Sequence, residues 1–173
     1  MWIELSLIFI CFILTVAVPS PTESYVTRTI SGSVNLFGVT FLNDELFVVR
    51  KYARQVEVYD STTLTLERHL VIAGTEEQHD MTSSAKYGCL YILALFADSG
   101  SVFRAEVNGS TARQTQWSLR NALIVKSGGI SATPDEENVI VTYSLTSLLQ
   151  EYTTHGVFRR FISLKAPNWL PAA

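Results

Sequence analysis

The chain has few cysteines and few charged residues. Two of its 173 residues are cysteine, and 17% are charged, against about a quarter in an average soluble chain. Cys11 lies in an apolar N-terminal run, and Cys89 stands alone in the apolar stretch GCLYIL without a basic neighbour. We therefore expect Cys89 to be a small buried hydrophobic residue rather than a catalytic thiol.

Neither sign of charge is concentrated anywhere in the sequence. The net charge is -3, and the longest run of like charge is Asp135–Glu137. Such a pattern gives no positive surface for a nucleic acid or an anionic membrane. We predict no nucleic-acid partner, and we expect the acidic stretch TPDEEN (residues 133–138) to be a solvated hairpin turn.

The sequence also lacks the spacings of metal and catalytic sites. There is no pair of histidines four residues apart, no cysteine pair and no aspartate-rich calcium loop. A glycine-rich phosphate loop, a nucleophile elbow and a dinucleotide fingerprint are missing as well. The sequence therefore predicts no catalytic residue, no metal and no cofactor.

The N-terminal segment contains almost no polar side chains. Leu5–Val18 is an apolar run closed by Pro19 and Pro21, which suits a signal peptide better than a membrane span of about 20 apolar residues. Small residues near Ala17 offer a cleavage site, but no Lys or Arg precedes the run, so an uncleaved anchor and a misassigned gene start stay open as alternatives. We expect residues 1–20 to be a signal peptide or membrane anchor and the protein to be secreted, with a membrane-anchored form as the alternative.

Asn108–Ser110 is an N-glycosylation triplet with a permissible glycine in the middle. Asn-Gly is also the favoured pair for a two-residue hairpin turn. Both interpretations can hold, because the tip of a hairpin tolerates a glycan. We predict a hairpin turn here, with glycosylation at Asn108.

Beyond Pro21, apolar and polar residues alternate with a period of two. The runs are short and rich in Val, Ile, Phe and Tyr, and residues typical of turns separate them. Helical spacing is not sustained. We predict an all-β body with about a dozen short strands, including ELFVVRKY (45–52), QVEVYD (55–60), CLYILALF (89–96), SVFRAEV (101–107), NVIVTYS (138–144) and RRFISL (159–164).

The predicted strands fall into three similar units. The units begin at Gly38, Asp80 and Gly129, and each start is followed by an apolar residue and then a hydroxyl residue. Four strands in a unit of about 40 to 50 residues are typical of a β-propeller blade. We predict a propeller body over residues 25–166 with antiparallel blades at about 34–74, 75–122 and 123–166, and a tail at 167–173.

Three stretches carry a resemblance to a known family: FGVTFLNDELFVVRKYARQVEVYDSTTLTLERHLVI (37–72), HDMTSSAKYGCLYIL (79–93) and GGISATPDEENVIVTYSLTSLLQEYTTHGVFRRFISL (128–164). The chain resembles uncharacterised invertebrate β-propeller proteins of the NHL-repeat-like superfamily from residue 37 to about 164. The resemblance implies the fold but no activity, because such propellers serve as binding platforms, enzymes and scaffolds. The second unit departs from the family pattern, since LALFADSGSVFRAEV (93–107) lacks its aspartate–glycine–strand run.

Three blades are fewer than the four to eight that usually close a propeller, and relatives of this kind often have six. The first and third blades would each leave an apolar face uncovered. The chain is then a fragment of a longer product, which we favour, or two copies close a six-bladed ring, or the open set is complete. We expect self-association through the open blade faces to be possible.

A ligand face is expected where the loops enter the first strand of each blade and where they join the second strand to the third. For His79, an exposed residue in a loop is a simpler interpretation than a residue of a binding site. Tyr59 and Tyr152 recur at one position of the repeat, where we expect them to fill the space between blades. The candidates for the first set of loops are Asn35, Phe37, Gln78, His79, Asp80 and Lys126, and those for the second are Lys51, Tyr52, Arg54, Phe96 and Asp98.

Together these features predict a non-enzymatic extracellular propeller module that binds a protein or a glycan. It would meet a membrane only if the N-terminal segment is uncleaved. The alternative is an enzyme of the calcium-assisted lactonase or lyase kind on the same fold. An adhesive β-sandwich is a third hypothesis, which would require strands without the repeat.

Overall fold

The computed structural model describes residues 36–50, 53–75, 77–96, 99–108, 111–120, 127–143 and 148–163. All of them belong to one compact unit, Ser33–Ala173. The predicted signal peptide or anchor (1–20) and tail (167–173) lie outside the described residues. The described part of the chain contains no helix capable of crossing a membrane.

Twelve strands form three four-stranded antiparallel sheets in the described residues, which confirms the predicted all-β, propeller-like fold. Each sheet uses four consecutive strands, and we call the sheets blades 1, 2 and 3. Blade 1 has β1 (Leu36–Leu42), β2 (Glu45–Arg50), β3 (Gln55–Asp60) and β4 (Leu66–Val71). Blade 2 has β5 (Gln78–Ser84), β6 (Cys89–Leu95), β7 (Gly100–Asn108) and β8 (Thr111–Ser118). Blade 3 has β9 (Gly128–Ala132), β10 (Asn138–Tyr143), β11 (Leu148–Thr153) and β12 (Phe158–Ser163).

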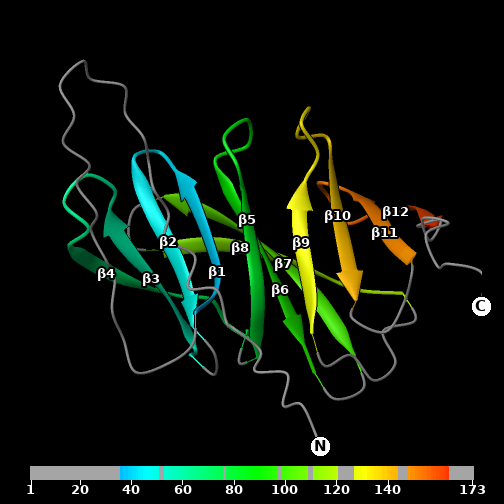
Figure 1. Cartoon of the computed structure of the whole chain (residues 1–173), viewed down its shortest axis with the longest axis horizontal. Coiled ribbons are helices and arrows are strands. Elements are labelled where there is room, and N and C mark those ends of the chain that lie inside the picture. Colours follow the sequence, from blue (N-terminus) through cyan, green and yellow to red (C-terminus); the bar gives the residue numbers. More distant parts are fainter. Residues whose placement is uncertain are drawn as a thin grey trace, which may run out of the picture. The chain divides into compact units, whose positions relative to one another are not determined.

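The first strands of the three blades are neighbours. Strand β5 contacts β1 on one side and β9 on the other, and β4 meets β8 farther out. Figure 1 shows β1, β5 and β9 in chain order across the view, with β2 beside β1 and β10 beside β9. This succession of blades around their first strands is the arrangement of a propeller.

Two hydrophobic cores join the blades, because apolar residues on alternate positions of each strand point to opposite faces of its sheet. Between blades 1 and 2, Phe47, Val49 and Val58 pack against residues such as Ile92 and Phe103. Between blades 2 and 3, the core includes the fully buried Cys89 of blade 2, which confirms its predicted packing role. The rest of this second core comprises Tyr91, Leu93, Leu95, Val102, Leu119, Ile130, Val139, Val141 and Tyr152.

The prediction that Tyr152 fills the space between blades is confirmed, whereas Tyr59 is buried (7% exposed) but belongs to neither of the two cores between the described blades. Tyr152 is 1% exposed and belongs to the core between blades 2 and 3. Tyr59 pairs with Leu46, on the face of blade 1 opposite to Phe47 and Val58. The two tyrosines occupy one repeat position, but only blade 3 has a described blade in front of that face.

Polar contacts add to the apolar ones between blades. The side-chain amide of Gln114 in β8 exchanges two hydrogen bonds of 3.1 Å with the backbone N–H and C=O of Ala73. Near the first strands, the Thr40 hydroxyl donates to Ser83 Oγ at 2.8 Å. Side-chain hydrogen bonds thus connect blade 1 to blade 2.

The turn at residues 133–138 is the predicted solvated hairpin, since it joins β9 to β10 and Pro134, Asp135 and Glu137 are exposed. It also makes contacts that the sequence did not predict. Glu136 Oε2 accepts hydrogen bonds from the Ser84 hydroxyl and, at 2.8 Å, from the Lys86 backbone N–H. Glu137 pairs with the Lys86 ammonium group and accepts from Tyr87. The acidic turn therefore connects blade 3 to the β5–β6 hairpin of blade 2.

Candidate functional site

Five of the predicted ligand-face residues with described positions lie at or near the start of a strand. They are Phe37, Arg54, Gln78, His79 and Asp80. Phe96 directly follows β6. Asn35, Lys51, Tyr52, Asp98 and Lys126 lie outside the described residues. Asn108 ends β7 and pairs with Thr111 of β8, which confirms the predicted hairpin, and glycosylation stays a prediction.

Phe37 and His79 form an aromatic pair across blades 1 and 2. Their ring centroids lie 5.3 Å apart with an interplanar angle of 21°, which is a stacked arrangement. Both residues are only partly buried. They occupy equivalent repeat positions, directly before Gly38 and Asp80, so neighbouring first strands bring them together. The sequence placed both residues on the same set of loops but gave no sign of the stack.

Asp80 joins blade 2 to blade 3. One carboxylate oxygen accepts a hydrogen bond from the Met81 backbone N–H at 2.8 Å, and the other accepts from the Ile130 backbone N–H at 2.9 Å. Burial raises the pKa of Asp80, and the two backbone N–H groups oppose that rise. Asp80 thus has a structural role at the predicted ligand face.

Gln78 also supports the structure of this region. Its side chain is 1% exposed, and its Nε2 donates to the Thr75 hydroxyl at 2.7 Å. That hydroxyl donates to the Ile72 carbonyl, also at 2.7 Å. The two bonds shape the connection from β4 to β5 and position His79 at the start of β5.

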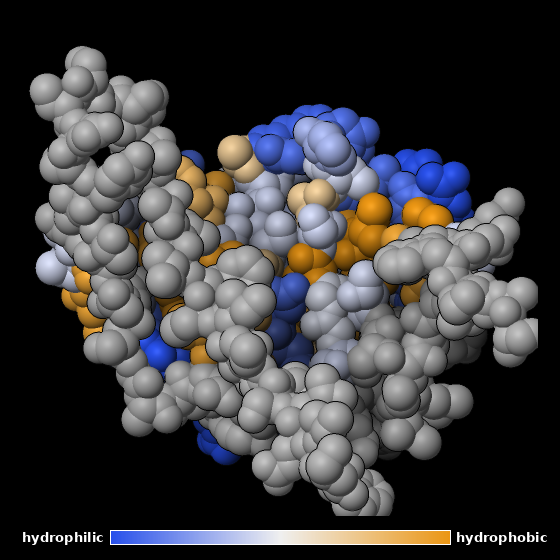
Figure 2. Space-filling view, viewed as in Figure 1, coloured by the Kyte–Doolittle hydropathy of each residue, from blue (hydrophilic) through white to orange (hydrophobic). Residues whose placement is uncertain are grey.

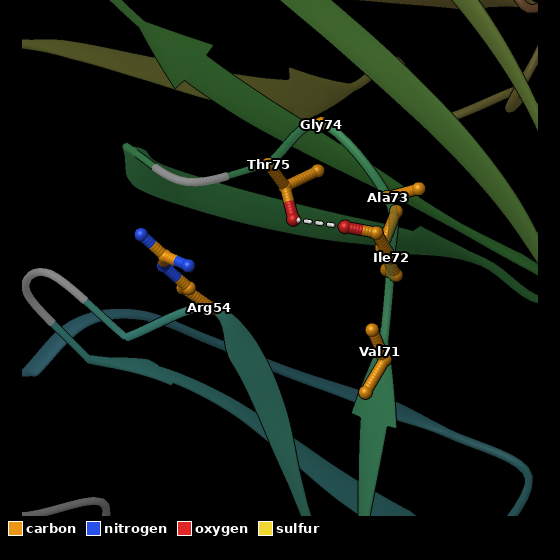
Figure 3. Close-up of a pocket in the computed structure, with 6 residues that line it drawn as sticks. All are labelled: Arg54, Val71, Ile72, Ala73, Gly74 and Thr75. Carbon is orange, nitrogen blue, oxygen red and sulfur yellow. Dashed lines mark hydrogen bonds between the residues drawn. The ribbon is translucent and has the colours of Figure 1, made fainter.

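A small pocket of about 130 Å³ lies beside Arg54. Figure 3 shows Arg54 next to the start of β3, Val71 at the end of β4, and the residues from Ile72 to Thr75 in the segment that follows β4. The lining is apolar apart from the guanidinium group and the Thr75 hydroxyl. The sequence identified Arg54, but the wall at 71–75 was missed because its residues carry no distinctive motif.

A second cavity of about 210 Å³ lies on blade 3, next to Asp80. It is lined by Gly129, Ser131, Ile140 and Thr142, together with Asp80 and Ile130. The repeat could have indicated this site, because Gly129 and Ser131 are the counterparts of Gly38 and Thr40.

The described residues hold no group of three or more His, Cys, Asp or Glu side chains arranged for a metal ion. The site thus consists of an aromatic stack, an arginine beside an apolar pocket, and a carboxylate engaged by backbone groups. This arrangement offers surfaces for contact with a ligand.

No family model and no curated protein sequence matches the chain. Solved structures do match. Hydrazine synthase of Kuenenia stuttgartiensis has a TM-score of 0.57 with 16% identity and covers 82% of this chain. A streptogramin B lyase has a TM-score of 0.58 with 13% identity and covers 76%. A Bacteroides caccae protein of unknown function has a TM-score of 0.53 with 9% identity and covers 80%.

These similarities show the fold. The neighbours are of the β-propeller type, and the three four-stranded sheets of this chain match them. The chain spans 40%, 41% and 49% of the lengths of the three structures. Because one propeller fold carries unrelated functions, the names of the neighbours assign no activity here.

Proposed function

We propose that this chain is a non-enzymatic, extracellular propeller module of the NHL-repeat-like kind that binds a protein or a glycan. The observation that carries the proposal is the Phe37–His79 stack. It presents two partly exposed rings at the starts of neighbouring first strands. Aromatic rings combine apolar area with few rotatable bonds, and they are common anchors at binding surfaces.

Arg54 extends the proposed binding face. Leu36 pairs with Arg50, and Val49 pairs with Val56, so the starts of β1 and β3 lie at the same end of blade 1. Phe37 and Arg54 therefore belong to one end of the blade. An arginine next to aromatic residues suits a ligand with both apolar and acidic or hydroxyl groups, such as a peptide or a sugar chain.

Secretion is supported by the sequence of residues 1–20, and the hairpin position of Asn108 is compatible with a glycan. The chemistry of the face supports binding over catalysis, because Asp80 accepts two backbone hydrogen bonds and Gln78 is buried at the start of β5. Neither is presented as an acid, a base or a nucleophile.

Binding by labelled protein to a glycan array and to an array of secreted proteins tests the proposal. We expect His79→Ala and Phe37→Ala to weaken binding at least tenfold, because each removes half of the stack. Val157→Ala is the matched control, since Val157 is a 63% exposed apolar residue in the β11–β12 turn. Equal binding by all variants that retain the wild-type melting temperature would contradict the proposed face.

A further inference from the structure

Strand β12 (Phe158–Ser163) is the outermost strand of blade 3. Among the described residues it pairs only with β11, and Figure 1 shows it at the right of the view, beside β11. A strand at the edge of a sheet presents backbone N–H and C=O groups on its outer side. Strand β12 therefore has the geometry to accept a further strand.

Two exposed arginines accompany this edge. Arg159 lies in β12 and Arg120 lies in the segment after β8, and neither forms an ion pair with a described residue. The neighbouring Arg160 pairs with Glu151, which is 7% exposed and so has little surface left for another partner. Strand β12 (FRRFIS) contains no acidic residue. In a chain with a net charge of -3, this edge is locally positive.

Arg120 is held beside β12 by its backbone and by its side chain. Its guanidinium carbon lies 4.5 Å from the centroid of the Phe158 ring, which is a cation–π contact. Its backbone N–H donates to the Tyr152 hydroxyl at 2.9 Å, and its carbonyl accepts from the side-chain amide of Gln150. The guanidinium group therefore has a defined place next to the strand edge.

A row of aromatic rings leads from the core between blades 2 and 3 to the surface at β12. The centroids of Trp117 and Tyr152 lie 6.4 Å apart, and those of Tyr152 and Phe158 lie 5.6 Å apart. Phe161 follows at 4.9 Å from Phe158 and is 42% exposed. Because Phe161 pairs with Gln150, it lies on the same side of the sheet as Arg120.

An exposed aromatic ring beside arginines has the composition of an interaction hot spot. Figure 2 shows hydrophilic surface, in blue, next to hydrophobic surface, in orange, at the upper right of the view, where Figure 1 places blade 3. The rings behind Phe161 are packed, so this surface is backed by a rigid core.

The outer strands of the other two blades lack this combination in the described residues. In β4, Arg68 pairs with both Glu45 and Glu67. Strand β8 (TARQTQWS) has one arginine, Arg113, and its only aromatic residue, Trp117, is partly buried. Edge strands often carry charge that prevents pairing with other edges. That role does not account for an exposed phenylalanine next to two arginines without ionic partners.

We propose that β12 and Arg120 form a second binding site, at which an extended acidic peptide segment of another protein adds a strand to blade 3. The peptide backbone pairs with the outer edge of β12, an apolar side chain rests on Phe161, and carboxylates contact Arg159 and Arg120. Successive side chains of a strand point to opposite sides, so the peptide that fits alternates acidic and apolar residues. The site is distinct from the Phe37–His79 face, and the inference does not depend on the proposed function.

An anionic membrane is another partner that arginines and aromatic rings suit. Such adhesion normally takes clusters of about four to eight basic residues. Among the described residues, Arg159 and Arg120 are the two arginines here without an ionic partner, and they accompany an open strand edge. The structure therefore favours the peptide.

Fluorescence anisotropy with a labelled peptide in which Glu and Leu alternate tests the proposal on the full chain. We expect the wild type to bind it, and added salt to weaken binding because it screens exposed charges. The same peptide with Lys in place of Glu is expected not to bind. Hydrogen exchange is expected to slow at the amides of β12 when the acidic peptide is present, and to stay unchanged in β8.

Charge reversal locates the site. Arg159→Glu and Arg120→Glu are each expected to weaken peptide binding at least tenfold. Arg113→Glu is the matched control, because it reverses an exposed arginine on the outer strand of blade 2, and it is expected to bind as the wild type does. If Arg120→Glu lowers the melting temperature through its contact with Phe158, Arg159→Glu decides the test.

Four results would overturn the proposal. They are no binding of the acidic peptide at millimolar concentration, equal binding of the Lys peptide, an unchanged affinity of a folded Arg159→Glu variant, and unchanged hydrogen exchange at β12. Binding to phosphatidylserine vesicles without binding to the peptide would also overturn it, and would identify a membrane-binding surface instead.

Discussion

At the scale of single residues, Asp80 carries a side chain at a repeat position where the other two blades have glycine. The unit starts are Gly38, Asp80 and Gly129, and their side-chain positions converge. A Cβ at Gly38 would lie 2.9 Å from Asp80 Oδ1, and one at Gly129 would lie 3.4 Å from Asp80 Oδ2. Glycine at both neighbouring unit starts leaves room for the Asp80 carboxylate, which accepts one hydrogen bond from blade 3, at the Ile130 backbone N–H.

The raised pKa of Asp80 predicts a pH dependence of stability. A carboxyl group whose pKa is higher in the folded state stabilises the fold below its ordinary value of 3.8, and that contribution is lost as the pH rises through the folded-state value. We expect the wild type to lose more stability between pH 4 and pH 7 than Asp80→Asn. Urea denaturation at each pH measures this. A constant difference between the two proteins would show that Asp80 titrates normally.

Gly38→Ala should destabilise the chain by about 1–3 kcal/mol, the usual range for overpacking. The added Cβ would lie 2.8 Å from a backbone nitrogen, and the backbone has little freedom to move away. Gly129→Ala is the control, because its closest contact is 3.1 Å to the Thr142 hydroxyl. In dilute, monomeric protein we expect it to have the smaller effect. Equal losses in chemical denaturation would contradict this account.

At the scale of elements, alternation predicts which residues share a face but not which neighbour that face meets. The strands and the Asn108 hairpin could be predicted because period-two runs and turn residues are local signals. Whether the side of the sheet that carries Tyr59 meets another blade could not be predicted, because this depends on the direction in which the blades follow one another. The contacts of Glu136 and the second bond of Asp80 were missed for a related reason, since their partners lie 50 or more residues away.

The two equivalent tyrosines allow a comparison within one chain. The Tyr152 hydroxyl donates to Gln150 and accepts from the Arg120 backbone N–H at 2.9 Å, whereas the Tyr59 hydroxyl donates to Glu57 at 2.8 Å. Tyr152→Phe removes the acceptor of the part-buried Arg120 N–H, and we expect a loss of about 1 kcal/mol, the usual net contribution of one hydrogen bond. Tyr59→Phe, measured by the same thermal and chemical denaturation of monomeric protein, is expected to cost less. The opposite order would contradict the assignment of the interface.

At the scale of the whole molecule, the proposed binding module and the calcium-dependent enzyme predict different responses to calcium. A ligand that binds only the folded state raises the melting temperature according to its concentration relative to Kd. We expect millimolar calcium to leave the melting temperature of the full chain unchanged, with magnesium as the control ion. A calcium-specific rise would favour the lactonase or lyase alternative.

Each blade consists of four consecutive strands, and this continuity affects how the chain can be made. The hydrogen bonds within a blade join residues close in sequence, whereas side-chain hydrogen bonds between the described blades, such as those of Gln150 and Glu136, span 30 to 52 residues. Hairpins with low contact order form faster than pairings that close long loops. During synthesis, blade 1 can form its hairpins before blade 2 has left the ribosome. Each new blade can then pack its apolar side chains against the blade that has already formed.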